Sequence, residues 1–197
     1  MTQFLLIRHG STDMLGVAIS GWLPGVGLTQ AGRDEVSALA QQFIGIRIHA
    51  LYTSPLERTR RTAGILAHSF GLEPIVCPEL GELRFGQWTG KSFEELRPDP
   101  HWQRFNTFRS GTRIPEGELM LDTQLRVVSF MLTLRDRHRD QTVALVTHGD
   151  VIKGALTYFL GMPLDLHPRL EISPASVSHI ELTDDSVQVL RVNATPA

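Results

Sequence analysis

The sequence predicts an α/β fold in which helices cover both faces of a mainly parallel sheet. Segments with the patterns of strands and helices alternate along most of the 197 residues, as in parallel strands joined by crossover helices. Two apolar stretches, residues 4–10 and 143–149, each end in His-Gly, which favours two equivalent strand ends. The short Asp184-Asp185 connection predicts an antiparallel hairpin at one edge of the sheet.

The first half of the chain carries clear strand and helix signals. A glycine-rich loop follows the first strand, and Thr29 is the expected N-cap of a helix. The apolar face of this helix consists of Val36, Leu39, Ala40 and Phe43. Residues 49–53 form the next expected strand. Ser54-Pro55-Leu56-Glu57 then predicts a capping box with proline at the first helical position, and this second helix is expected to end near Gly71.

The middle of the chain predicts an interruption of the sheet. A short strand is expected at residues 74–77, and Ser92 with Glu95 forms a second capping-box pattern, which Pro98 stops. Residues 87–117 are rich in Trp, Phe, Arg, Pro and Gly without clean periodicity. This composition favours a helical excursion over the crevice at the end of the sheet. We interpret the segment as a lid.

The last third returns to the alternating pattern. One apolar face of a helix over residues 118–138 is predicted by Leu121, Leu125, Val128 and Leu132. The second His-Gly strand follows, and then a helix that ends near Leu160. Two strands, near residues 177–182 and 187–192, close the chain.

Length and composition restrict the class of protein. The chain is expected to form a single domain, residues 1–197, with the lid as an excursion from it. Nineteen basic and twenty-one acidic side chains give a formal net charge of −2, which argues against nucleic acid or an anionic membrane as a partner. Cys77 is the only cysteine and is interpreted as a small buried side chain. Because neither a leader pattern nor a long apolar run occurs, we expect a cytoplasmic protein.

The two His-Gly pairs mark the most informative positions of the chain. Parallel strands deliver their carboxyl ends to one crevice, where ligands bind in open α/β sheets, so His9 and His148 are expected to meet there. The glycines leave backbone N–H groups uncovered, which suits an anion. Arg8, beside the first of these histidines, favours a phosphate over a metal ion.

Phosphoryl transfer needs cations around the phosphate oxygens, an in-line nucleophile and a proton donor for the leaving group. His9 is the candidate nucleophile, with one ring nitrogen held by a backbone carbonyl and the other free to form a phosphohistidine. For an isolated histidine, a satisfied strand end would be the alternative. Arg58 lies in the first turn of the second helix, where a cation opposes the helix dipole and an anion would explain it.

Glu82 is the candidate general acid. It lies among apolar and glycine residues in the stretch 80–88, and such surroundings raise a carboxyl pKa by desolvation. From composition alone, ordinary surface exposure of this carboxylate stays equally open.

These residues resemble the histidine phosphatase superfamily, in the branch that contains the cofactor-dependent phosphoglycerate mutases and their phosphatase relatives. The resemblance covers nearly the whole chain and rests on Arg8-His9-Gly10, Ser54-Pro55-Leu56-Glu57-Arg58 with Thr62-Ala63, residues 82–90, and Thr147-His148-Gly149. It implies a three-layer α/β/α fold without a metal or other cofactor. It also implies that His9 is the phosphorylated nucleophile and Glu82 the proton donor, while the phosphate pocket is lined by Arg8, Arg58 and His148, with a backbone donor from Gly149.

The chain departs from the branch at two places. Many relatives read Arg-His-Gly-Glu-Thr followed three residues on by Asn, whereas this chain has Ser11, Thr12 and then Leu15. Ser11 and Thr12 are candidates to replace the missing polar phosphate contact, and tying the turn is their alternative role. Relatives often show Gly-Glu-Ser before the long helix, where this chain has Gly117-Glu118-Leu119.

Hydrolysis of a small phosphorylated metabolite is the function that the resemblance favours. Mutases of the branch carry Arg-His-Tyr-Gly where this chain has Leu83-Arg84-Phe85-Gly86, so a mutase is the second hypothesis and a phosphate-binding module without turnover is the third. Which phosphomonoester is used stays open among sugar phosphates, phosphoglycerate, phosphoserine and α-ribazole phosphate. The sequence also leaves a homodimer open.

Two groups of side chains are candidates for the leaving-group site. The aromatic candidates, for which packing of the lid is the favoured alternative, are Trp22, Trp88, Phe93, Trp102, Phe105 and Phe108. The basic candidates for a carboxylate or second phosphate are Arg97, Arg104, Arg109 and Arg113, most of which we interpret as a solvated face.

Overall fold

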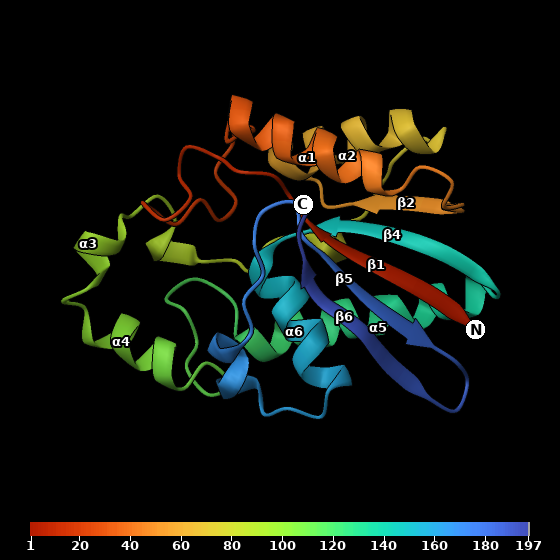
Figure 1. The fold of residues 1–197 in the computed structure, drawn as a ribbon. Coiled ribbons are helices and arrows are strands. Elements are labelled where there is room, and N and C mark those ends of the chain that lie inside the picture. The colour runs from red at the N-terminus through yellow and green to blue at the C-terminus, as the bar shows by residue number, and fades with distance from the viewer. Residues whose placement is uncertain (197) are drawn as a thin grey trace.

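A computed structural model describes residues 1–196 and confirms the predicted α/β class (Figure 1). Within these residues a single sheet has six strands in the order β3-β2-β4-β1-β5-β6. In chain order the strands are β1 (Thr2–Arg8), β2 (Ala50–Thr53), β3 (Ile75–Val76), β4 (Gln141–Thr147), β5 (Val177–Leu182) and β6 (Val187–Ala194). Neighbouring strands from β3 to β1 are parallel, whereas β5 pairs antiparallel with β1 and β6 antiparallel with β5. The predicted antiparallel edge is therefore confirmed.

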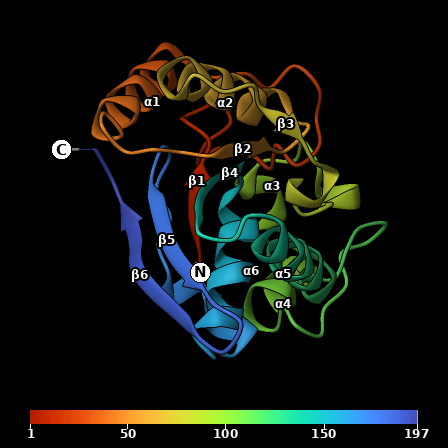
Figure 2. The same cartoon turned by 90° about the vertical axis from the view of Figure 1, so that its right-hand side faces the viewer.

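Helices lie on both faces of this sheet. They are α1 (Gln30–Gln42), α2 (Glu57–Phe70), α3 (Phe93–Leu96), α4 (Pro100–Thr107), α5 (Met120–Arg137) and α6 (Gly149–Phe159), with short 3-10 helices η1 (Pro78–Leu80), η2 (Gly86–Trp88) and η3 (Leu164–Arg169). Figures 1 and 2 show α1 and α2 together on one face and α5 and α6 on the other. This is the three-layer arrangement that the resemblance implies.

The core is divided between the two faces by the alternation of side chains along the strands. In β1, Phe4 and Leu6 join the cluster under α5 and α6, and Leu5 and Ile7 join the cluster under α1 and α2. All four side chains are buried. Because β1 is apolar on both faces, it occupies an interior place in the sheet.

Three helix ends test the capping predictions. Thr29 caps α1, since its side chain accepts from the Gly32 N–H at 2.9 Å, and Ser92 with Glu95 completes a capping box on α3. The prediction for Ser54 is wrong: α2 begins at Glu57, two residues after Pro55, and its N-cap residue forms no side-chain cap. The Ser54 hydroxyl instead lies against a histidine of the candidate site, described below.

The buried face of α5 differs from the predicted one. Leu121 and Leu125 are 44% and 69% exposed, so their assignment to the core is wrong, whereas Val128 is buried and Leu132 is partly buried. The helix buries Met120, Thr123, Val127, Val128, Met131 and Leu134. Apolar residues occur on more than one side of this helix, so periodicity alone fits two faces. The structure selects the face that includes Met120.

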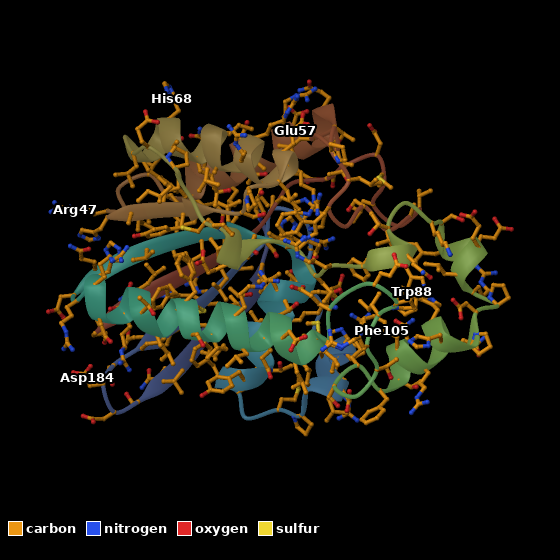
Figure 3. The ribbon with its side chains drawn as sticks, turned by 180° about the vertical axis from the view of Figure 1, so that it is seen from behind. Arg47, Glu57, His68, Trp88, Phe105 and Asp184 are labelled. Atoms are coloured by element: carbon orange, nitrogen blue, oxygen red, sulfur yellow. The ribbon has the colours of Figure 1, made fainter. Side chains whose placement is uncertain are left out.

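The segment 87–117 leaves the sheet and packs into a third small core, which it shares with residues such as Ile19, Leu83 and Leu164. It carries α3 and α4, which Figure 1 shows beyond the end of the sheet. Trp88 and Phe105 are fully buried there, with ring centroids 5.3 Å apart, and Figure 3 shows them side by side. Packing therefore accounts for these two aromatic candidates.

Among residues 1–196, none of the helices combines the length and apolar character needed to cross a membrane.

Candidate active site

The register of the sheet brings the two His-Gly pairs together. β1 and β4 are adjacent and parallel, with Arg8 opposite Thr147, and the His9 N–H donates to the Thr147 carbonyl at 3.1 Å. The rings of His9 and His148 follow at the same end of the sheet, with centroids 5.3 Å apart. Both side chains are buried. The predicted meeting of these two residues is observed.

The hydrogen bonds of His9 fix which ring nitrogen carries the proton. Nδ1 lies 2.8 Å from the Gly10 carbonyl oxygen, which only accepts, so Nδ1 is the protonated nitrogen. Nε2 accepts from Arg58 Nε at 3.2 Å. Burial, reinforced by the charge of Arg58, lowers the pKa of His9 to about 3. The ring is therefore neutral at physiological pH, with the Nε2 lone pair directed toward the cations of the site.

Two arginines, Arg58 buried and Arg8 partly buried, supply positive charge around His9. Arg58 is 1% exposed; its Nη2 donates to the Gly21 carbonyl at 2.9 Å and lies 3.8 Å from Glu82 Oε2. Arg8 Nη1 donates to the Ile172 carbonyl. Arg58 Nη1 and Arg8 Nε are buried donors without a hydrogen-bond partner among the described residues. Because buried donors are normally paired, these atoms indicate a place for an acceptor.

His148 adds a third donor to the same place. Its Nε2 lies 2.8 Å from Ser54 Oγ, and its buried Nδ1 has no hydrogen-bond partner within residues 1–196. Nδ1 lies 3.6 Å from Glu82 Oε2. Burial, followed by the charge of Arg58, holds the pKa of His148 well below its ordinary value. The ring therefore contributes a neutral donor and not a fixed charge.

Glu82 is largely buried, with 12% of its side chain exposed. Its Oε1 accepts from the Leu83 N–H at 2.9 Å. Burial and then the negative charge of Asp150 raise the pKa of Glu82 to about 7, although Arg58 and Arg8 oppose this rise. The alternative of ordinary surface exposure is therefore wrong for this side chain. At neutral pH the carboxyl group holds a proton about half of the time, which suits general acid and base chemistry.

Two glycines permit the close approach of backbone at the site. A Cβ on Gly10 would collide with the Gly32 carbonyl oxygen in the first turn of α1, while the Gly10 N–H donates to Thr62 Oγ1 at 3.2 Å. Gly149 is the first residue of α6, and a Cβ there would face the Arg8 guanidinium at 3.4 Å. The N-terminus of α6 thus faces the place where the buried donors converge.

Three further residues predicted for substrate binding occupy different positions. Thr12 lines the cavity in front of His9. Ser11 lies outside it, and its hydroxyl donates to Glu35 Oε1 at 2.7 Å, so this side chain ties the turn to α1. Trp22 also lies outside the lining, and its Nε1 donates to the Glu82 carbonyl at 2.7 Å.

The cavity in front of His9 has a volume of about 310 Å³. Its lining combines the apolar side chains of Leu15, Phe93 and Trp102 with the charged side chains of Arg109, Asp150 and Lys153. We call these three charged residues the charged wall. The expectation of a solvated basic face is correct for Arg97, Arg104 and Arg113, which are exposed. Arg109 is the exception.

Asp150 and Lys153 were not recognised from the sequence as site residues. Arg109 Nη1 lies 3.2 Å from Asp150 Oδ2, and His167 Nε2 lies 3.7 Å from Asp150 Oδ1. Burial alone would raise the pKa of Asp150, but Arg109 and His167 hold it below its ordinary value. The sequence does contain a signal for them, because residues 149, 150 and 153 follow His148 at helical spacing and share one face of α6.

Within residues 1–196 no group of three or more His, Cys, Asp or Glu side chains is placed to hold a metal ion.

Comparison with known proteins places this geometry in a family. Residues 4–195 match the family model for the histidine phosphatase superfamily (branch 1). The chain is 27% identical to phosphoserine phosphatase 1 of Hydrogenobacter thermophilus, over 99% of this chain and 93% of that protein. It is 30% identical to the probable phosphoglycerate mutase GpmB of Yersinia enterocolitica, over 92% of this chain and 85% of that protein.

A solved structure agrees with these relatives. YhfR of Bacillus stearothermophilus superimposes with a TM-score of 0.91 at 29% identity, covering 100% of this chain and 98% of that one. A phosphohistidine mechanism is typical of the family, which includes proteins named as phosphatases. The fold, the paired His-Gly strand ends and the family match together show that the chain belongs to the histidine phosphatase superfamily, branch 1.

Proposed function

We propose that the protein is a metal-independent phosphomonoesterase that hydrolyses a small phosphorylated metabolite through a phosphohistidine at His9. The observation that carries this proposal is the state of His9: a neutral ring, with its Nε2 lone pair facing Arg58 in a buried pocket. Such a ring is a nucleophile ready for use at neutral pH. The buried donors on Arg8, Arg58 and His148 supply the stabilisation that three phosphoryl oxygens need.

In the first step, the lone pair of His9 Nε2 forms a bond to phosphorus while the ester P–O bond breaks. The departing oxygen takes the proton of Glu82, so the products are phosphohistidine, a neutral alcohol and the Glu82 carboxylate. Arg58 then donates to a phosphoryl oxygen in place of Nε2, because that nitrogen no longer has a free lone pair. The bond from Nδ1 to the Gly10 carbonyl keeps the ring in position throughout.

In the second step, the Glu82 carboxylate takes a proton from water as the water oxygen attacks phosphorus. The N–P bond breaks, the electron pair returns to His9 Nε2, and inorganic phosphate leaves. A carboxyl group with a pKa of about 7 suits both steps, since each protonation state is well populated at neutral pH.

Hydrolysis is favoured over transfer to a second hydroxyl. Arg84, in the stretch where mutases of the branch carry Arg-His-Tyr-Gly, is exposed and stacks over the Trp22 ring at 4.1 Å. It therefore lies outside the cavity lining and adds no cation for a second phosphate.

A single cysteine and balanced charge support a cytoplasmic location and a small-molecule substrate.

The decisive experiment combines trapping and turnover. Phosphate release from phenyl phosphate is measured with chelator present for wild type, His9→Ala and the matched control His68→Ala, and intact masses are recorded after alkaline quenching. His68 is exposed and lies near the end of α2 that is opposite Glu57 (Figure 3). We expect one added phosphoryl group in the wild type, retained activity in His68→Ala, and a loss of about 10⁴-fold or more in His9→Ala.

Two outcomes would overturn the proposal. One is turnover that requires added divalent metal or is insensitive to His9→Ala. The other is transfer without hydrolysis, which single turnover in ¹⁸O-labelled water reveals: a phosphatase places one label in inorganic phosphate, whereas a mutase returns unlabelled phosphoryl groups to an alcohol. A phosphate-binding module would show neither adduct nor release.

A further inference from the structure

Lys153 places a positive charge at the cavity that no ion pair within residues 1–196 neutralises. It lines the same cavity as Arg8 and His9 and is one of only two lysines in the chain. Among the described residues, Asp150 and Glu171 are the acidic side chains whose charges act on Lys153. Neither of them forms an ion pair with its ammonium group. An unpaired, half-buried ammonium is costly, and burial lowers the pKa of Lys153. A ligand anion would remove this cost.

Arg109, the other cation of this wall, is already neutralised. Its Nη1 lies 3.2 Å from Asp150 Oδ2, its Nη2 donates to Asn106 Oδ1 at 3.1 Å, and its guanidinium stacks over Phe105 at 4.4 Å. These contacts tie α4 to α6 and use the charge of Asp150. The charged wall of Arg109, Asp150 and Lys153 therefore carries one net positive charge, located on Lys153.

The position of Lys153 sets how far this charge lies from the phosphoryl group. Gly149 begins α6 beside Arg8, and Lys153 follows four residues later, about 6 Å along the helix axis. An anion held by Lys153 would thus be a few bonds away from the ester oxygen. The same cavity is also lined by the apolar side chains of Leu15, Phe93 and Trp102, which suit the carbon atoms between the two charges.

Resting on the function proposed above, we propose that Lys153 selects phosphomonoesters whose leaving group carries a single carboxylate, that is, the phosphate esters of small hydroxy acids. The phosphate dianion is matched by Arg8 and Arg58, and the carboxylate by Lys153. A second phosphate would bring two further negative charges to a wall that offers one positive charge.

The test compares esters that differ only in this charge. The probes are 3-(phosphonooxy)propanoate and propyl phosphate, and kcat/KM is measured for wild type, Lys153→Met, Lys153→Arg and the matched control Lys91→Met, the exposed second lysine. We expect the wild type to prefer the carboxylate ester. Lys153→Met should reduce this preference by about ten-fold to a hundred-fold, the range for a hydrogen bond to a charged group, and Lys153→Arg and Lys91→Met should retain it. Lys153→Glu should instead prefer 3-aminopropyl phosphate.

Three other outcomes are possible, and each of them contradicts a different part of the proposal. Equal turnover of both esters by the wild type, or an equal loss on both in Lys153→Met, overturns the role of Lys153 and leaves the phosphatase function intact. A stronger preference for propane-1,3-diyl bisphosphate overturns the choice of a carboxylate. Failure of all esters, with no phosphohistidine, overturns the phosphatase function itself, so the two failures are distinguishable.

Discussion

Ser54 Oγ lies 2.8 Å from His148 Nε2, although the two residues are 94 positions apart in the chain. The same hydroxyl oxygen accepts weakly from the Leu56 N–H at 3.3 Å. Among the described residues, His148 Nε2 is the only acceptor within reach of the Ser54 hydroxyl proton. We therefore assign Ser54 as the donor, which leaves the ring proton on Nδ1, the atom that faces Glu82 and the phosphate pocket. A residue whose pattern predicts a helix cap thus fixes the tautomer of a site histidine.

We predict that Ser54→Ala weakens both stability and activity. Removing the hydroxyl leaves Nε2 of the fully buried His148 without a partner, which should lower the free energy of unfolding by about 1–3 kcal/mol. With the tautomer no longer fixed, kcat/KM should also fall. Urea denaturation and steady-state kinetics measure the two effects, with Ser69→Ala, an exposed serine of α2, as the control. Wild-type kinetics in Ser54→Ala would contradict the tautomer assignment.

We predict that the effect of Glu82→Gln depends on the leaving group. Glutamine cannot donate a proton to an alkoxide, so kcat/KM for propyl phosphate should fall by about 10²–10⁴-fold. The loss should be much smaller for 4-nitrophenyl phosphate, whose leaving group departs as a stable anion. Parallel kinetics on the two esters measure the difference. Equal losses would show that Glu82 acts in some way other than protonating the leaving group.

We predict that Glu82→Gln also stabilises the fold at alkaline pH. The pKa of Glu82 is about 7 in the folded protein, above its unfolded value, so folding favours the protonated form. This contribution is complete below the unfolded pKa and is lost as pH rises through 7. At pH 8 the variant should gain on the order of 1–3 kcal/mol over the wild type, and little at pH 5. Thermal unfolding of the wild type and the variant at pH 5 and at pH 8 tests this, with Glu94→Gln, at an exposed position, as the control.

We predict that Asp150→Asn shifts the pH dependence of the reaction. The charge of Asp150 helps to raise the pKa of Glu82, so removing it should lower that pKa. The alkaline limb of kcat/KM for propyl phosphate should move to lower pH by up to about one unit. Exposed Asp122→Asn is the control. An unmoved limb would show that the charge of Asp150 does not contribute to the pKa of Glu82.

We predict opposite effects for two glycine substitutions. Gly10→Ala places a Cβ against the Gly32 carbonyl oxygen, so it should lower the free energy of unfolding by about 1–3 kcal/mol or more. Gly64 lies in the middle of α2 with open space around its Cβ position. Gly64→Ala should therefore raise the free energy of unfolding by about 0.5–1 kcal/mol. Urea denaturation of both variants tests the contrast, and a neutral Gly10→Ala would show that the loop can move.

Local patterns predict local features of this protein well and long-range contacts poorly. Thr29 and Ser92 act as the caps that their sequences predict, because a cap is satisfied within three residues. Ser54 carries an equally clear pattern but contacts His148 across the sheet, and no short-range signal contains that contact. The faces of α5 illustrate the same limit, since apolar periodicity permitted two faces and tertiary packing chose the one that exposes Leu125.

The candidate site shows a similar division. His9 and His148 were predictable because two matching strand ends imply parallel neighbours. The acidity of Glu82 depends on Asp150, which lies 68 positions away in sequence, and that partnership exists only in three dimensions. In the sequence Arg109 cannot be told apart from the three arginines that prove to be exposed, yet it is the only one of these four that lines the cavity.

The pairing of β1 with β4 has a consequence for how the protein gains and loses activity. Arg8 and Thr147 face each other in register, and a slip by one residue would turn every side chain of one strand to the opposite layer. The two histidines are therefore assembled by the same backbone hydrogen bonds that close the centre of the sheet. A partly folded state in which β1 and β4 are apart would keep His9 and His148 apart as well. Catalysis is therefore tied to the same cooperative unit that gives the sheet its stability.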